Sequence, residues 1–393
     1  MRGELNFTML RFMYLTLIFL SVWNTSVQPA SALLKKTMDE SVKEELTAFV
    51  SRLFTDRAQY LIDHDKDHLM KHYVQDIASS RHALHREIAR GDYVKAWAEH
   101  RGLHFTDAHS HVRIVRIVER GNEIFISAVQ SLRLDYAYTH SRQPVQSFGI
   151  GTRHGFTLTK KNGMWQILRE WYLDPLEENP KLIPDSSGMI FRPHEERKDG
   201  STLEEEQAVP SNRKQRYNRQ KAVDYANKYA GTAWGAGHNN RYNQKYRDYS
   251  GEGGDCTNFA SQCVGDQEEG GGLPKKAGWR HIPSVGGTQT WVQTDAFKNF
   301  LIHSGYGRVI ASGSFEQIVK PSDRFPKGAI AALKPGDLIA YVMKGDVDHF
   351  AIVVGFDVLG YVLVNCHSAD RYRVPFDLGW DKHTRYILIH IRD

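Results

Sequence analysis

Hydrophobic positions near the N-terminus recur at the three- and four-residue spacing of amphipathic helices. One such run covers residues 38–62 and a second follows the polar turn at 64–67. The apolar positions that define them are Val42, Leu46, Phe49, Leu53 and Leu61 in the first run and Leu69, Tyr73, Ile77, Leu84 and Ile88 in the second. This spacing predicts two helices that bury one face each.

The period then changes to that of strands. Residues 112–117, 124–129, 155–158 and 165–168 are short apolar or alternating runs, and the turns at 120–122 and 161–163 carry Gly-Asn and Asn-Gly pairs. Such pairs between strand-like runs predict hairpins. Helices followed by an antiparallel sheet indicate an α+β domain. Its order of elements resembles that of the nuclear-transport-factor-like cone.

The last third of the chain has a second mixed pattern. We expect helices at 217–229, from Cys256 onward, and at 291–302, separated by a loop rich in aromatic residues and Asn (231–254) and a Gly-rich segment (270–287). Strands are expected at 338–342, at the run opened by His349, at 361–367 and at 386–391, with a turn at 357–360. This part is therefore a second α+β domain with an antiparallel sheet.

Composition divides the chain into four parts. Residues 1–32 have Arg2 and Arg11, a short apolar core and a small-residue site ending at Ala32, which is typical of a secretory signal peptide. Cleavage there leaves 393 − 32 = 361 residues. Residues 184–212 are charged and poor in large apolar side chains, which predicts a flexible acidic linker. The predicted domains are thus 33–183 and 213–393, in an exported protein of the cell envelope or exterior.

Charge and cysteine usage narrow the class of function. Residues 213–393 hold 24 Lys+Arg against 18 Asp+Glu, an excess of 24 − 18 = 6, which suits an anionic envelope or polymer; no nucleic-acid-binding motif accompanies it. Cys256 and Cys263 are seven residues apart, about 10 Å along one helix and beyond disulfide reach. A pairing of Cys263 with Cys366 stays open. Cys256 is the best candidate for a free thiol.

Cys256 and His349 form a candidate nucleophile and base. Gly253-Gly254-Asp255 precedes the thiol, which predicts that a helix begins there, with Asp255 as its N-cap and the helix dipole beside the sulfur. His349 opens an apolar strand and could pair with the thiolate and protonate a leaving amine. The alternative is that Cys256 is a small buried hydrophobic residue and His349 a hydrogen-bonded strand histidine.

The surroundings of both residues carry a family resemblance. The segments Asp255-Cys256-Thr257-Asn258-Phe259 and Asp348-His349-Phe350-Ala351-Ile352-Val353, together with the loop at 242–249 and Asn365-x-His367, resemble the putative bacterial amidase domain family. That family looks like a branch of the papain-like cysteine hydrolases, and the match covers about 217–391. The resemblance implies a helix-borne nucleophile, a histidine on a facing sheet and hydrolysis of an amide or peptide bond.

Further site residues follow as candidates. Asn365 fits best as the group that orients His349, with His367 and Asp370 as alternatives, because strand register decides which can reach the ring. Asn239, Asn240 and Tyr246 could donate to an oxyanion or only satisfy loop backbone. Trp234, Trp279 and Trp291 could wall a substrate groove, although isolated tryptophans are more often core residues.

Metal and cofactor sites are not expected. His64, His68 and His72 have the spacing of one helix face but lie in a predicted turn without a carboxylate or cysteine constellation, and the cysteines lack a CxxC pair. The Gly270–Gly272 run has no phosphate-loop Lys-Ser/Thr. The sequence thus predicts an exported cysteine amidase or peptidase that acts on a peptide or amide, with a non-catalytic binding module or a thiol acyltransferase as alternatives; its oligomeric state is not predicted.

Overall fold

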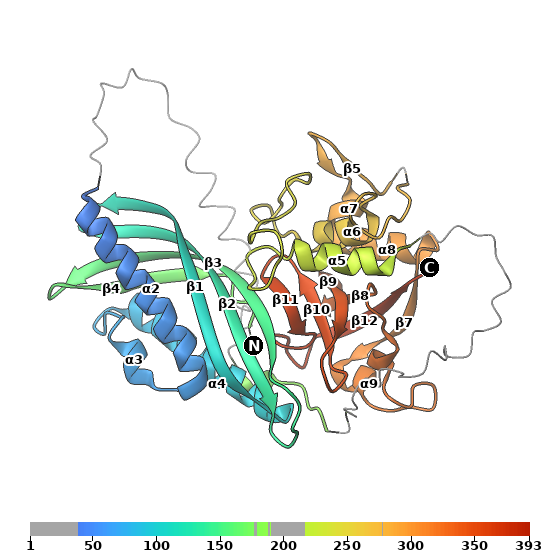
Figure 1. The fold of residues 1–393 in the computed structure, drawn as a ribbon, viewed down its shortest axis with the longest axis horizontal. Coiled ribbons are helices and arrows are strands. Elements are labelled where there is room, and N and C mark those ends of the chain that lie inside the picture. Colours follow the sequence, from blue (N-terminus) through green and yellow to red (C-terminus); the bar gives the residue numbers. More distant parts are fainter. Residues whose placement is uncertain (1–37, 177–178, 188, 190–216, 277) are drawn as a thin grey trace, which may run out of the picture.

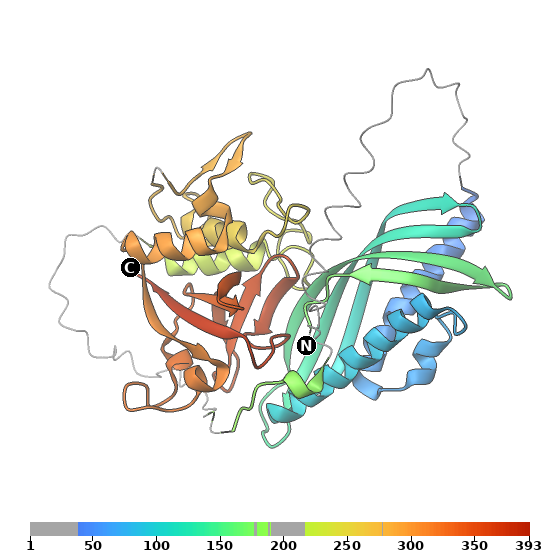
Figure 2. The same ribbon diagram turned by 180° about the vertical axis from the view of Figure 1, so that it is seen from behind.

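The protein is described by a computed structural model that covers residues 38–176, 179–187, 189, 217–276 and 278–393 (Figures 1 and 2). It has the α+β class expected, with helices and a large antiparallel sheet. The predicted signal peptide and nearly all of the predicted linker lie outside the described residues. Among the described residues, no helix is long and apolar enough to cross a membrane.

Three helices open the N-terminal part. They are α2 (Glu40–Asp63), α3 (Lys66–Met70) and α4 (Ala78–His100). Helix α2 begins where the side chain of Asp39 accepts a hydrogen bond from the backbone of Ser41, and it ends at His64, which adopts a left-handed conformation. The second predicted helical run is divided: α3 ends at Met70 and α4 begins eight residues later.

Four strands follow, and each is longer than its sequence pattern indicated. They are β1 (Leu103–Arg120), β2 (Glu123–Tyr138), β3 (Gln146–Lys161) and β4 (Met164–Tyr172). Both predicted hairpins are confirmed, with antiparallel β1–β2 and β3–β4 pairs joined by two-residue turns. Asn162 and Gly163 both have positive φ, as a tight Asn-Gly hairpin requires. Helices α2 and α4 pack on one face of this curved sheet (Figure 1).

The C-terminal part places helices on both faces of a second set of strands. The helical elements are α5 (Arg219–Lys228), α6 (Cys256–Gly265), α7 (Gln289–Val292), α8 (Thr294–His303), α9 (Phe315–Val319) and the short 3-10 turn η2 (Ala329–Ala332); another 3-10 turn, η1 (Pro180–Leu182), follows β4 in the N-terminal part. The strands are β5 (His281–Ile282), β6 (Gly286–Gly287), β7 (Gly307–Ser314), β8 (Leu338–Met343), β9 (Asp346–Phe356), β10 (Val362–Cys366), β11 (Asp370–Pro375) and β12 (Arg385–Ile391). Strands β7 and β11 were not expected, and Gln293 divides the predicted helix at 291–302 into α7 and α8.

One sheet runs through both parts of the chain. Its strand order is β1-β2-β3-β11-β10-β9-β8-β12-β7, with β4 also paired to β3. The junction is the antiparallel pair β3–β11, in which Gly149, Ile150 and Gly151 lie opposite Tyr372, Arg371 and Asp370. Figure 1 shows the two strands side by side between the lobes. The predicted boundary between the domains is therefore bridged by backbone hydrogen bonds.

Buried side chains also bridge the two parts. Val374 and Leu378 belong to the same hydrophobic cluster as Trp97 and Leu134 of the N-terminal part. Asp377 is fully buried and forms a 2.6 Å ion pair with Arg101, which is itself 1% exposed. A shared core and a buried ion pair fix the orientation of the two lobes more firmly than a linker alone would.

Candidate functional site

Helix α6 presents Cys256 as its first residue, as the sequence predicted. Gly253 and Gly254 have φ of 111° and 133°, so the chain enters the helix through a conformation that favours glycine. All ten residues of α6 are buried, and Cys256 is 7% exposed. The helix packs on β9, the strand of His349 (Figure 1). The sulfur thus lies at the positive end of a buried helix, against the sheet.

The thiol has a mixed electrostatic environment. Burial raises the pKa of Cys256 above its ordinary value, and the negative charge of Asp255 acts in the same direction. The backbone N–H groups of Phe350 and Thr257 oppose this rise, as does the Thr257 hydroxyl, whose Oγ1 lies 3.8 Å from Sγ. In the absence of substrate, the neutral thiol is therefore favoured.

Asp255 holds the start of α6 in a way that the sequence did not indicate. It occupies the N-cap position, but its side chain does not cap the helix backbone. Instead Oδ1 accepts from the backbone N of Tyr249 (2.9 Å) and from Nδ2 of Asn258 (2.8 Å), while Oδ2 lies 2.6 Å from Nδ1 of His367. The capping prediction for this side chain was wrong, because a buried histidine takes its second oxygen.

His367 is held on all sides. Its ring stacks between Tyr242 and Phe259, with centroid distances of 3.7 and 3.8 Å. Nε2 lies 2.6 Å from the carbonyl oxygen of Tyr229, which can only accept, so Nε2 carries a hydrogen. A proton is then shared between Nδ1 and the Asp255 carboxyl group. Both ring nitrogens are engaged, and His367 anchors the first turn of α6.

His349 lies on the other face of the sheet from α6. Phe350 packs in the hydrophobic cluster beneath α6, whereas the ring of His349 packs 5.7 Å from Tyr341 and 5.4 Å from Trp380, measured between centroids. Its Nε2 is buried and has no hydrogen-bond partner among the described residues. Burial, aided by the positive charges of Arg371 and His367, lowers the pKa of His349 to about 3, so the imidazole is neutral near pH 7.

The structure does not bring Asn365 to His349. Asn365 pairs with Ile352 across β9–β10, and Ile352 is three positions along the strand from His349, an odd number, so the Asn365 and His349 side chains point to opposite faces. Nδ2 of Asn365 donates to the carbonyl of Ala226 (3.0 Å), and Oδ1 accepts from the backbone of Arg373 (2.6 Å). A register shift does occur farther along this hairpin, but Asn365 and His349 still differ in face.

The residues considered for an oxyanion hole and a groove lie apart from one another. Asn239 and Asn240 are turn residues with φ of 48° and 56°. Tyr246 donates its hydroxyl to Asp266, the residue after the C-terminal end of α6 and thus at the opposite end from Cys256. Trp234 is partly exposed, with the Arg133 guanidinium 4.7 Å above its ring.

The other two tryptophans are core residues in this structure. Trp279 and Trp291 are both fully buried, with ring centroids 4.9 Å apart. Trp279 donates Nε1 to Ser261 (3.1 Å) and Trp291 donates Nε1 to Asn258 (2.9 Å). Their indoles thus pack against α6 and donate hydrogen bonds to two of its side chains. Because both indoles are fully buried, they do not line a groove that a substrate could enter.

Asp370 forms a buried centre that sequence reasoning considered only as a partner of His349. It is fully buried and accepts from the backbone N (2.7 Å) and Oγ1 (2.6 Å) of Thr232 and from the hydroxyl of Tyr242 (2.6 Å). Nη2 of Arg153, on β3, lies 3.3 Å from the same carboxylate. No sequence motif pointed to Arg153. The glycines at 149 and 151, four and two residues earlier on the same strand, are a signal that could have indicated the close approach of another backbone to β3.

Among the described residues, the remaining thiols and the histidines form neither a disulfide nor a metal site. All three cysteines are free, so the open pairing of Cys263 with Cys366 does not occur. No group of three His, Cys, Asp or Glu side chains that could hold a metal ion occurs in the part of the chain that the structure describes. His72 instead bonds Asp56 at 2.6 Å, and His68 lies 3.5 Å from Asp65.

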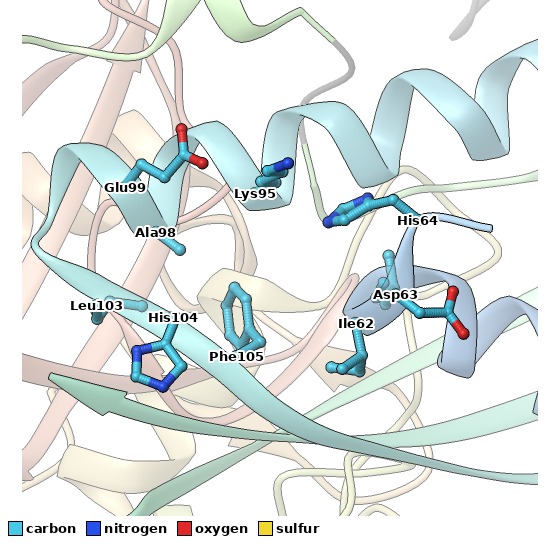
Figure 3. Close-up of a pocket in the computed structure, with 10 residues that line it drawn as sticks. Ile62, Asp63, His64, Lys95, Ala98, Glu99, Leu103, His104 and Phe105 are labelled. Atoms are coloured by element: carbon cyan, nitrogen blue, oxygen red, sulfur yellow. The ribbon is translucent and has the colours of Figure 1, made fainter. Parts of the chain in front are cut away.

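A separate cavity lies in the N-terminal part, between the ends of α2 and α4 and the start of β1 (Figure 3). Its volume is about 320 Å³. Apolar side chains such as Phe105 share its walls with charged ones, including Lys95 and Glu99. No residue of the C-terminal part lines it, so this cavity is distinct from the surroundings of Cys256.

Comparison with known proteins links the C-terminal part to a family. Residues 216–390 match the family model described as a putative amidase domain. The uncharacterized protein YhbB of Bacillus subtilis (strain 168) is 30% identical over 202 residues, which cover 48% of this chain and 55% of the relative. The chain thus spans about half the length of this curated relative.

Solved structures match the chain over about a third of its length. The intermembrane space region of the chloroplast protein ARC6 is 15% identical, with a TM-score of 0.24 over 35% of this chain and 97% of that one. A putative scytalone dehydratase from Novosphingobium aromaticivorans DSM 12444 is 16% identical, with a TM-score of 0.25 over 34% and 87%. An NTF-2-like protein of unknown function from Silicibacter pomeroyi DSS-3 is 13% identical, with a TM-score of 0.22 over 34% and 96%. The C-terminal part of the chain, residues 216–390, is thus similar to the putative amidase domain family.

Proposed function

We propose that the C-terminal part hydrolyses an amide or peptide bond with Cys256 as the nucleophile. The observation that carries the proposal is the position of Cys256 at the head of the buried helix α6, with the backbone N–H of Phe350 against its sulfur. A helix N-terminus and a backbone donor both stabilise a thiolate, and the Cys256 amide is placed to donate to a tetrahedral oxygen. The family match supports the reaction class.

His349 is the proton acceptor in this proposal. His367 has both ring nitrogens engaged, whereas Nε2 of His349 is buried without a partner among the described residues. Sγ would attack the carbonyl carbon as its proton passes to His349, the C–N bond would break, and the amine would leave with that proton. Water then cleaves the thioester, which releases the acid and restores the thiol.

The proton transfer requires a change in side-chain position. No hydrogen bond joins the thiol to His349 among the described residues, and the ring lies on the far face of β9. Contacts of this kind often form only when substrate is bound. We therefore expect substrate to bring thiol and imidazole together, by side-chain rotation or through a bridging water.

The substrate class and location rest on the sequence. A signal-peptide pattern at 1–32 and the basic excess of the C-terminal part favour an exported enzyme that acts on a peptide or amide of an anionic cell envelope. The papain-like superfamily is part of the same proposal.

A non-catalytic binding module is the second candidate. The observations that favour it are the raised pKa of the Cys256 thiol and the absence of a thiol–imidazole bond in the described structure. A thiol acyltransferase would use the same nucleophile but pass the acyl group to an amine or alcohol instead of water.

The test is amine release from cell-wall peptides and from peptidyl coumarin amides. We expect Cys256→Ala to lower kcat at least about a thousandfold and His349→Ala about a hundredfold or more. Cys263→Ala, seven residues along the same helix, is the matched control and should retain activity. Full turnover by Cys256→Ala would refute cysteine catalysis. Absence of turnover with every substrate would favour the binding module, and product formation only with an added amine would identify an acyltransferase.

A further inference from the structure

Strand β3 of the N-terminal part lies directly against the loop that leads to Cys256. A Cβ atom on Gly149 would lie 1.9 Å from the carbonyl oxygen of Trp234, and one on Gly151 would lie 2.2 Å from Oγ1 of Thr232. Only glycine allows two backbones to approach so closely. The sequence of β3 is thus fitted to this loop, and the contact extends beyond the pairing of β3 with β11.

Arg153 continues the same strand and supplies the charge that faces Asp370. The carboxylate is fully buried, which by itself raises its pKa, but the positive charges of Arg153 and His367 and the bonds from Thr232 and Tyr242 outweigh burial and lower the pKa. The Arg153 side chain is 41% exposed, and its guanidinium lies 5.2 Å from the ring of Tyr242. Arg153, a residue from the other part of the chain, is therefore the largest of the contributions that keep Asp370 ionised.

A continuous series of contacts joins this ion pair to the thiol. Asp370 accepts the hydroxyl of Tyr242, and the Tyr242 ring stacks on His367 with an interplanar angle of 10°. His367 in turn holds Asp255, the residue before Cys256. Asp370, His367 and Asp255 are buried and Tyr242 is partly buried, so the groups are closely packed from the ion pair to the residue beside the thiol.

We propose that Arg153 of the N-terminal part is a positioning residue for the Cys256 site, acting through Asp370, Tyr242 and His367. The inference rests on the proposed function in taking Cys256 as the reactive group. It assigns to the N-terminal part a role in the chemistry of the C-terminal part, because β3 packs on the loop that leads to the thiol and Arg153 pairs with Asp370.

The loss of the Arg153 charge has a predictable direction. Without Arg153, Asp370 would either stay ionised without this counterion or take up a proton. A protonated Asp370 would accept a weaker hydrogen bond from the Tyr242 hydroxyl. Either change allows more movement of the Tyr242 ring, which stacks on His367, and so weakens the hydrogen bond between His367 and Asp255. A less restrained Asp255 carboxylate beside the sulfur disfavours the thiolate, so the thiol should ionise at higher pH.

The experiment measures the rate of iodoacetamide alkylation of each cysteine in the full chain as a function of pH, by peptide mass spectrometry. We expect Arg153→Met to move the Cys256 midpoint up by about 0.4 to 1.5 pH units. Arg153→Lys, which keeps the charge, should restore most of the shift. Arg113→Met, at an exposed arginine on β1, is the matched control and should leave the midpoint in place.

The buried cysteines 263 and 366 report on folding in the same sample. If Arg153→Met only destabilised the protein, their labelling would rise together with that of Cys256, and that result would contradict the inference. If Arg153→Met does not fold, Tyr242→Phe, which removes the hydroxyl bonded to Asp370 but keeps the stacked ring, should give a shift of the same sign. An unchanged Cys256 midpoint in the folded variant would overturn the proposal.

Alkylation does not need turnover, so this test is separate from that of the proposed function. A shifted midpoint in a protein without hydrolytic activity would support the role of Arg153 while overturning the hydrolase proposal. An unshifted midpoint in an active enzyme would do the opposite. Where turnover is found, Arg153→Met should lower kcat by about 2- to 30-fold.

Discussion

Replacement of Asp377 by Asn should destabilise both parts of the protein at once. The carboxylate is fully buried and accepts from Nε1 of Trp97 (3.0 Å) and from Nε (3.0 Å) and Nη2 (2.6 Å) of Arg101, with the Tyr361 hydroxyl on its other oxygen at 2.6 Å. The substitution keeps the shape but leaves the Arg101 guanidinium buried without a counterion.

The magnitude follows from that unpaired charge. Loss of one partner of a buried ion pair costs about 3 to 5 kcal/mol, which is roughly two to three and a half powers of ten in the unfolding equilibrium. Arg101→Met in the same chain removes the second charge, so the double variant should be less destabilised than the sum of the two single variants. The coupling arises because each single variant leaves the other charge buried.

Urea unfolding followed by circular dichroism and by tryptophan fluorescence measures this effect. Both signals should move together, because Asp377 bonds residues of both parts across a shared sheet. Asp76→Asn, which breaks an exposed pair with Lys161, is the control and should leave the transition in place. A loss below about 1 kcal/mol for Asp377→Asn, or additive single variants, would refute the reasoning.

Two further predictions concern His349 and the glycines of β3. The pKa of His349 is about 3 in the folded protein and 6.5 is its ordinary value, so between these pH values only the unfolded chain binds a proton at this ring. The contribution of the neutral ring to stability is therefore fully present above pH 6.5 and is lost as the pH falls. His349→Gln should flatten this pH dependence of the free energy of unfolding, measured from pH 7 to 4. Gly149→Ala should lower the free energy of unfolding by about 1 to 3 kcal/mol or more, because its Cβ would lie 1.9 Å from the carbonyl oxygen of Trp234. Gly155→Ala, whose Cβ would have its nearest contact at 3.5 Å from Phe125, should lower it clearly less. Equal losses of stability in urea unfolding would contradict this steric account.

Periodic hydrophobic runs predicted most elements of the fold. Helix α2, both N-terminal hairpins and the strands β8, β9, β10 and β12 follow directly from them. Strand β11 was not predicted because its sequence is rich in charge, with Asp370, Arg371 and Arg373 in six residues. Those charges are compatible with a central strand only because partners distant in sequence, such as Arg153 for Asp370, neutralise them, and such partners leave no local pattern.

The candidate site shows the same limit. The two glycines and Asp255 correctly predicted a helix that begins at Cys256. The face on which His349 lies could not be predicted, because a one-residue change of register moves a side chain to the other side of a sheet. The stacked position of His367 depends on a loop, through Tyr242, and on Phe259 of α6, and only the folded chain brings these together.

The junction between β3 and β11 has a consequence for the order of folding. The partners Gly151 and Asp370 are 370 − 151 = 219 residues apart, so the ribosome releases β11 long after β3. Until then, the first half of β3 is an unpaired strand edge that carries two glycines, the kind of edge to which other chains can add. A chain without β11 would expose this edge, so β11 of the C-terminal part also protects the part made first from aggregation.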